Sequence, residues 1–103
     1  MSGNAKKGVS EIDRIIGNNI RMQRDHVDFS AEYLGSILGV SYQQVIKYEK
    51  CMNKLSAAQI PILACILEVP VMSIYEGVNL DMLDEYCEGR LLTHIKNGAF
   101  DIL

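Results

Sequence analysis

A chain of 103 residues, 49% hydrophobic and 22% charged, is long enough for one folded domain and too apolar for a disordered protein. It has no uninterrupted apolar run of about 18 residues, and no apolar segment follows its N-terminal lysines, so the sequence predicts neither a membrane span nor a signal peptide. The net charge of −3 is unevenly spread: residues 1–54 hold eight basic and six acidic side chains, whereas residues 55–103 hold two and seven. This asymmetry allows a basic face on the first half of the chain and an acidic surface on the second.

The cysteines and histidines do not indicate a metal or catalytic site. Cys51, Cys65 and Cys87 are odd in number and form no CxxC pair, so we expect reduced thiols in a cytoplasmic protein, with Cys65 in the core. His26 and His94 belong to no obvious cluster with metal-ligand spacing, and phosphate-binding-loop, zinc-protease and nucleophile-elbow motifs are absent from the sequence. The sequence therefore predicts no metal, no cofactor and no enzymatic activity.

Helix signals begin after residues 1–9, which we expect to form a flexible arm. Ser10 and Asp13 make a capping box for a helix that reaches about Asp25, and its apolar side carries Ile12, Ile16 and Ile20. A second, short helix is capped by Ser30 and ended by Gly39, and its expected inward side chains are Leu34, Ile37 and Leu38. A third helix starts at the S-x-x-Q capping box of Ser41 and Gln44, with Val45 and Tyr48 facing inward.

The second half of the chain continues the pattern after a loop at Cys51–Leu55. A fourth helix begins either at the capping box of Ser56 and Gln59 or near Gln59, with Pro61 in its first position. A fifth, short helix spans Pro70–Glu76 and stops at Gly77, and Asn79 caps a further helix that Gly89 ends, before a last helical turn or two. The sequence thus predicts an all-α protein with five helices in residues 10–77 and a short C-terminal helical extension in residues 78–103.

The two short helices around Gly39 form the unit that indicates a function. Gly35 is small where two helices must cross closely, Gly39 permits a sharp turn with positive φ, and Val40 can fill the corner between the helices. The outward face of the third helix carries long side chains, several of them hydrogen-bonding: Tyr42, Gln43, Gln44, Ile46 and Lys47. Because glutamine can bond the edge of adenine and lysine that of guanine, this face is suited to reading the major groove of DNA.

From about Ile16 to Gly77 the chain resembles the Cro/repressor-type helix-turn-helix family, also called lambda-repressor-like or xenobiotic-response-element-like. The resemblance is carried by Leu34, by Leu38-Gly39-Val40-Ser41, by Val45-Ile46-Lys47-Tyr48-Glu49, and by Leu63-Ala64, Leu67 and Val69. It implies a compact five-helix DNA-binding domain and a bacterial transcriptional regulator, which we expect to be a repressor. Part of the third helix, Tyr42–Lys50, is particularly similar to a subgroup of bacterial regulators.

The resemblance also implies roles for individual residues. Base contacts are expected from Tyr42, Gln43 and Lys47, and from Gln44 between them, although its capping role competes with base contact. Phosphate contacts are expected from Asn53 and Lys54 in the loop after the third helix, and Arg24 is expected to pair with Glu49 as part of the scaffold. The chain itself adds three further phosphate contacts, because helix N-termini and lysines attract phosphate: Ser30, Ser41 and Lys50.

Three positions depart from the family pattern. Ala31 stands where a glutamine often bonds phosphate, Cys51 stands where glycine is usual and must adopt a left-handed conformation or reshape the loop, and Pro61 is unusual inside the fourth helix. Cys51 could also be a redox sensor, with a thiol pKa lowered by Lys50 and Lys54. A cysteine that stands at this position by chance, without a function, is the stronger interpretation.

Other functions remain open beside the regulator. One is an antitoxin-like protein that shares DNA binding with a protein partner held at the acidic C-terminal region. Another is a helical interaction module that has lost DNA affinity, which Ala31 and the net charge favour mildly.

We expect a homodimer on DNA, because an isolated helix-turn-helix unit reaches few bases and usually acts in pairs. The surface expected to pair is apolar and C-terminal: Leu80, Leu83, Tyr86, Leu91, Leu92 and Ile95. The alternative is that these side chains simply pack back on the domain.

Overall fold

Every regular element of the protein in residues 10–98, the part of the chain that the computed structural model describes, is helical. The elements are α1 (Glu11–His26), α2 (Ala31–Leu38), α3 (Tyr42–Glu49), α4 (Gln59–Leu67), the 3₁₀ helix η1 (Val71–Tyr75), α5 (Leu80–Tyr86) and α6 (Arg90–Lys96). The predicted all-α fold is therefore confirmed. The expected N-terminal arm at 1–9 and the end of the C-terminal extension, 99–103, lie outside the described residues.

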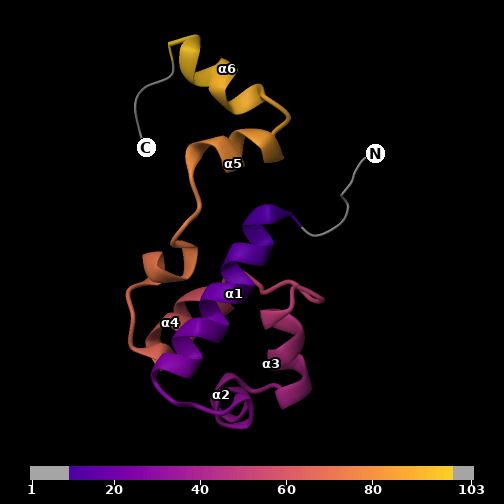
Figure 1. Ribbon diagram of the computed structural model, residues 1–103, viewed down its shortest axis with the longest axis vertical. Coiled ribbons are helices and arrows are strands. Elements are labelled where there is room, and N and C mark those ends of the chain that lie inside the picture. The colour runs from indigo at the N-terminus through magenta and orange to yellow at the C-terminus, as the bar shows by residue number, and fades with distance from the viewer. Residues whose placement is uncertain (1–9, 99–103) are drawn as a thin grey trace.

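Helix α1 is the centre of the main body, with α3 and α4 on either side of it and α2 across its C-terminal end (Figure 1). Between these helices lie the buried hydrophobic side chains: Ile20, Leu34, Val45, Ile60, Leu63, Ala64, Leu67 and Ile74. Most of these positions follow from the apolar periodicity. Two predicted core residues are wrong: Ile37 is 49% exposed at the end of α2, and Cys65 is exposed on α4.

Four helices, α1, α2, α3 and α5, are capped by the serine or asparagine that the sequence predicts. Around Ser10 both halves of the capping box are present, because the Ser10 hydroxyl accepts from the Asp13 N–H and the Asp13 carboxylate accepts from the Ser10 N–H. At Ser41 the structure records only one half, the Gln44 N–H donating to the serine hydroxyl at 3.1 Å.

Helix α4 begins at Gln59, the later of the two expected starts, after Ala58, which provides no side-chain cap. The Gln59 side chain accepts from the Ser56 N–H at 2.8 Å, but the Gln59 N–H donates to the Ser56 carbonyl at 3.1 Å, so only one half of the expected capping box forms. Pro61 is the third residue of α4 rather than its first, a position that still needs no intrahelical N–H donor.

The 3₁₀ helix η1 takes the place of the predicted fifth helix and is fastened to α1 by one side chain. The Asn19 amide donates to the carbonyl oxygens of Ile74 at 2.9 Å and of Glu76 at 2.8 Å. These bonds fix the point at which the chain leaves the main body, just before Gly77 turns it with a φ of 98°.

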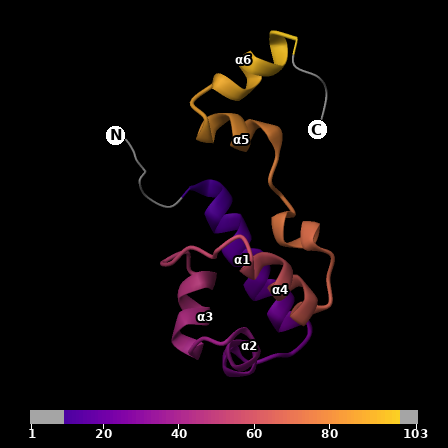
Figure 2. The same ribbon diagram turned by 180° about the vertical axis from the view of Figure 1, so that it is seen from behind.

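Helices α5 and α6 form a hairpin at one end of the molecule, which we call the C-terminal arm (residues 80–96). Helix α5 contacts α1. Figures 1 and 2 show the arm beyond the N-terminal end of α1, at the opposite end of the long axis from α2 and the start of α3. Asn79 caps α5 by accepting from the Met82 N–H at 2.9 Å, and the Asp84 carboxylate accepts from the Leu92 N–H at 2.8 Å, which sets the hairpin angle. No helix in residues 10–98 is both long and apolar enough to cross a membrane.

Candidate nucleic-acid interface

The corner between α2 and α3 is built on two glycines. Gly39 ends α2 in the left-handed region with a φ of 86°, and the N–H groups of Gly39 and Val40 both donate to the Gly35 carbonyl, at 2.8 and 3.0 Å. A Cβ atom on Gly35 would lie 2.6 Å from the Val40 carbonyl oxygen, so only glycine lets the chain fold back this tightly. Val40 packs against the core from inside the corner, as a helix-turn-helix requires.

Helix α3 presents two chemically different sides. Its back is packed into the main body through Val45, 1% exposed, and the half-buried Tyr48, whose hydroxyl accepts from the Gln59 amide at 3.1 Å. Its front is open: Tyr42 is 48% exposed, and Gln43 and Lys47 are also exposed. Gln44 is half-buried, which separates it from the other three expected base-contacting residues.

Arg24 and Glu49 lie in contact and tie the end of α3 to α1. The guanidinium donates to both carboxylate oxygens, Nε to Oε2 at 2.6 Å and Nη2 to Oε1 at 3.0 Å, and its Nη1 donates to the Phe29 carbonyl at 3.0 Å. The Glu49 side chain is only 2% exposed and that of Arg24 13%. The hydrogen bond to Glu49 raises the pKa of Arg24 against the opposing effect of burial, so the guanidinium keeps its positive charge.

Gly17 completes this junction, and the sequence analysis missed it. A Cβ atom at Gly17 would lie 2.7 Å from the Glu49 carbonyl oxygen and 2.8 Å from that of Tyr48. Because Gly17 has no side chain, the C-terminal end of α3 packs directly against the backbone of α1. A glycine in the middle of a regular helix lowers helix stability by about 1 kcal/mol relative to alanine. Its presence there could have indicated that another part of the backbone packs closely against this position.

The residues expected to contact phosphate line the two helix starts and the loop after α3. Ser30 and Ser41 are exposed and cap α2 and α3, each hydroxyl accepting from the backbone N–H three residues on. Lys50, Asn53 and Lys54 are exposed, and the Lys54 ammonium lies 4.0 Å from the Asp13 carboxylate. The front of α3 and this loop are thus exposed together, whereas Ala31 offers no hydrogen bond beside Ser30.

Cys51 occupies the left-handed position after α3, with a φ of 64°, so the expected backbone strain is present. Its thiol donates to the Asp13 carbonyl at 3.2 Å. Burial and the Asp13 carboxylate raise the pKa of Cys51, which contradicts the idea of a redox sensor activated by neighbouring lysines.

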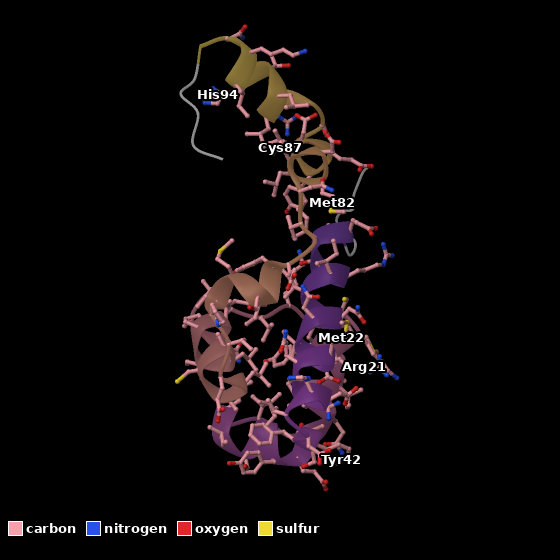
Figure 3. All side chains as sticks on the ribbon, turned by 60° about the vertical axis from the view of Figure 1, so that its left-hand side comes forward. Arg21, Met22, Tyr42, Met82, Cys87 and His94 are labelled. Atoms are coloured by element: carbon pink, nitrogen blue, oxygen red, sulfur yellow. The ribbon has the colours of Figure 1, made fainter. Side chains whose placement is uncertain are left out.

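The six apolar residues expected to mediate dimerisation all lie on the C-terminal arm. Leu80, Leu83, Leu91, Leu92 and Ile95 are half-buried, and Tyr86 is 64% exposed. In Figure 3, Tyr42 at the start of α3 and His94 on α6 mark opposite ends of the molecule. The structure therefore separates these residues from the expected DNA-contacting ones.

The chain is similar in sequence to several bacterial transcriptional regulators. The chain is 39% identical over 71 residues to an HTH-type transcriptional regulator of Sinorhizobium medicae, an alignment that covers 69% of this chain and 51% of the relative. It is 33% identical over 63 residues to a transcriptional regulator in the ATPase CF(0) region of Rhodospirillum rubrum, which covers 61% of this chain and 58% of the relative.

A solved structure has the same fold. The P22 c2 repressor, crystallised with a synthetic operator, superposes with a TM-score of 0.55 at 21% identity, covering 61% of this chain and 96% of the repressor chain. The chain therefore has the fold of this repressor and is similar in sequence to HTH-type transcriptional regulators. In this fold, α2 and α3 are the helix-turn-helix unit.

The helix-turn-helix fold also occurs as part of larger proteins. The hydroxypropylphosphonic acid epoxidase from S. wedmorenis superposes with a TM-score of 0.61 at 17% identity, over 66% of this chain but only 36% of the epoxidase. The chain spans about half the length of the curated relatives it matches. No protein-family model matches the chain.

Proposed function

We propose that this protein is a transcriptional regulator, acting as a repressor, that binds a specific sequence of duplex DNA with α3 in the major groove. The observation that carries the proposal is the two-sided packing of α3, which is held from behind by Val45 and Glu49 and open in front at Tyr42, Gln43 and Lys47. A major groove admits a helix, and side chains near the N-terminal end of that helix reach the base edges. The HTH-type relatives and the operator-bound P22 c2 repressor support the same interpretation.

The readers of sequence in this proposal are Gln43 and Lys47, whose amide and ammonium groups match the hydrogen-bonding edges of adenine and guanine. Tyr42 contributes apolar contact, for instance to a thymine methyl group. Gln44 has a smaller role, because it is half-buried beside the cap.

The phosphate anchors in this proposal are Ser30, Ser41, Lys50, Asn53 and Lys54. The two serine hydroxyls use their oxygen lone pairs as caps, and their O–H groups are left to donate to phosphate. On binding DNA, the Lys54 ammonium leaves the Asp13 carboxylate and pairs with a phosphate. Losing the pair with Asp13 costs little free energy, because the Lys54 side chain is 67% exposed. These contacts fix the register of α3 but carry no sequence information.

The test is selection of bound sequences from a random pool of duplex DNA, followed by gel shifts on the recovered site and on a scrambled site. We expect recovery of a defined site that is bound far more tightly than the scrambled one. Repression is tested by placing that site across a promoter and measuring transcription with and without the protein. If no sequence is enriched from the pool, α3 is not a reader and the proposal is wrong.

A further inference from the structure

We propose that Gln59 is a positioning residue for DNA binding, which ties the loop after α3 (residues 51–58) to α3 itself. The inference rests on the proposed function, in which Asn53 and Lys54 of this loop anchor phosphates while α3 reads the bases. Phosphate contacts fix the register of a recognition helix only if the anchors keep a constant position relative to that helix. A side chain that connects the two therefore contributes to DNA binding without touching DNA.

Gln59 makes this connection with both ends of its side-chain amide. The Oε1 atom accepts from the N–H of Ser56, near the end of the loop, at 2.8 Å. The Nε2 atom donates to the hydroxyl of Tyr48, on the packed side of α3, at 3.1 Å. One half-buried side chain thus ties the end of the loop to α3.

The start of the loop is tied to the same turn of α3. The Cys51 N–H donates to the Tyr48 carbonyl at 3.1 Å, and the Met52 N–H donates to the Lys47 carbonyl at 2.8 Å. Tyr48 therefore holds both ends of the loop, one through its backbone and the other through its hydroxyl. The expected anchors lie between these two attachments, so their position relative to Lys47, an expected reader, depends on both.

Packing fixes only part of this loop. Leu55 packs against the core, but a cavity of about 110 Å³ beside it is lined by Asn53 and Lys54 from the loop and by Ile16 and Ile60 from the main body. The Lys54 side chain is 67% exposed, so its ion pair with α1 stabilises the loop little. The position of the two anchors therefore depends on the hydrogen bonds at the ends of the loop.

The first experiment measures the order of the loop without DNA. Gln59→Met keeps a good helix former but removes both hydrogen bonds, and Tyr48→Phe removes only the bond to α3. Either change should raise the rate at which iodoacetamide modifies Cys51 about two- to tenfold for each bond lost, because the loop opens more often. Cys65, exposed on α4, is the internal reference, and its rate should not change.

A conservative variant and a matched control accompany this measurement. Gln59→Glu should keep the slow modification of Cys51, because a carboxylate accepts both from the Ser56 N–H and from a Tyr48 hydroxyl that has rotated to donate. Adding Tyr48→Phe to Gln59→Glu should make the modification fast again. Ser56→Ala, an exposed position that keeps its N–H, is the control and should leave the rate unchanged.

The second experiment measures affinity for the selected DNA site by gel shift. Gln59→Met and Tyr48→Phe should each lower the affinity about two- to tenfold, and the double variant should bind as Gln59→Met does. Lys54→Ala should lower the affinity less in the Gln59→Met background than in the natural chain, because an anchor that is no longer positioned contributes less. A residue that only stabilised the fold would leave the effect of Lys54→Ala unchanged.

The inference is overturned if Cys51 reacts at the natural rate in both variants, or if their DNA affinity is unchanged. It is also overturned if Lys54→Ala has the same effect in both backgrounds. A natural chain that binds no DNA sequence overturns the proposed function instead, and the modification of Cys51 still shows whether Gln59 holds the loop.

Discussion

In the proposed complex Gln43, like Lys47, recognises a particular base, whereas the phosphate anchors bind every DNA sequence alike. In the proposed complex its amide makes two hydrogen bonds to one base, so Gln43→Ala should weaken binding to the preferred site by about 1–3 kcal/mol and relax discrimination at a single base pair. Competition gel shifts with point-substituted sites measure both effects. Unchanged affinity and unchanged preference after Gln43→Ala would show that α3 does not read the sequence.

Lys54→Ala is the matched comparison, because this residue is exposed but lies in the loop beyond the C-terminal end of α3. It should weaken binding to every DNA sequence alike and reduce the slope of log affinity against log salt by about one unit, since one phosphate fewer is neutralised. Filter binding at several salt concentrations gives that slope. A loss confined to one base pair would instead make Lys54 a reader.

Arg24 acts on stability rather than on recognition. Arg24→Ala leaves the Glu49 carboxylate, 2% exposed, without its partner, so we expect a loss of about 3–5 kcal/mol in the free energy of unfolding and a parallel loss of all DNA binding. Urea unfolding followed by circular dichroism measures the loss. Replacing both residues together, Arg24→Met with Glu49→Leu, should recover much of it, whereas equal losses in the single and double variants would mean that the pair itself is not responsible.

Cys51 and Cys65 should differ in reactivity. Cys65 is exposed on α4, whereas Cys51 is half-buried, donates to the Asp13 carbonyl and has a raised pKa. At neutral pH we therefore expect iodoacetamide to modify Cys65 well before Cys51, and the rate at Cys51 to rise only at a pH above that of an ordinary thiol. Peptide mass mapping of a time course gives the order. Modification of Cys51 first would contradict the assigned environment.

At the scale of the elements, the contact between α1 and the end of α3 depends on Gly17. Alanine there gains about 1 kcal/mol of helix propensity, but its Cβ atom meets two backbone carbonyl oxygens, and overpacking of this kind costs about 1–3 kcal/mol. We expect Gly17→Ala to lower the melting temperature despite the better helix former. Asn18→Ala, exposed on the same helix, is the control and should leave stability nearly unchanged.

The elements were predictable from local signals, and the errors have identifiable causes. Serine and asparagine caps with apolar spacing predicted α1, α2, α3 and α5, whereas α4 and α6 have no side-chain cap and η1 is a 3₁₀ helix. Helix α4, QIPILACIL, is apolar on all sides, so periodicity does not distinguish the buried Leu63 from the exposed Cys65. In α2, Ile37 fits the pattern of Leu34 and Leu38 equally well, and only the tertiary packing leaves it outside.

The candidate site was predictable where a single element determines it and not where two elements meet. The open front of α3 follows from residues within one helix. The role of Gly17 depends on residues about 30 positions further along the chain, and no local pattern contains that information.

At the scale of the whole molecule, the core and the arm should be separable. Because every buried hydrophobic residue among residues 10–98 lies within Ile20–Ile74, deletion of residues 79–103 should leave the helical fold intact and remove the expected dimer. The melting temperature of the full chain should then rise with protein concentration, whereas that of the shortened chain should not, since mass action stabilises only the associating form. Differential scanning calorimetry at two concentrations tests this. A shortened chain that still shows the concentration dependence would remove the interface from the arm.

The position of the arm has a consequence for the DNA sites that a dimer can occupy. The arm joins the main body through the short connection between Glu76 and Asn79, at the far end of the molecule from α2 and the start of α3. In the dimer expected on DNA, the angle at this connection would decide how far apart the two copies of α3 lie, while duplex DNA presents equivalent half-sites about 34 Å apart. Base preference and half-site spacing would then be set by different parts of the chain, so that each could change during evolution without disturbing the other.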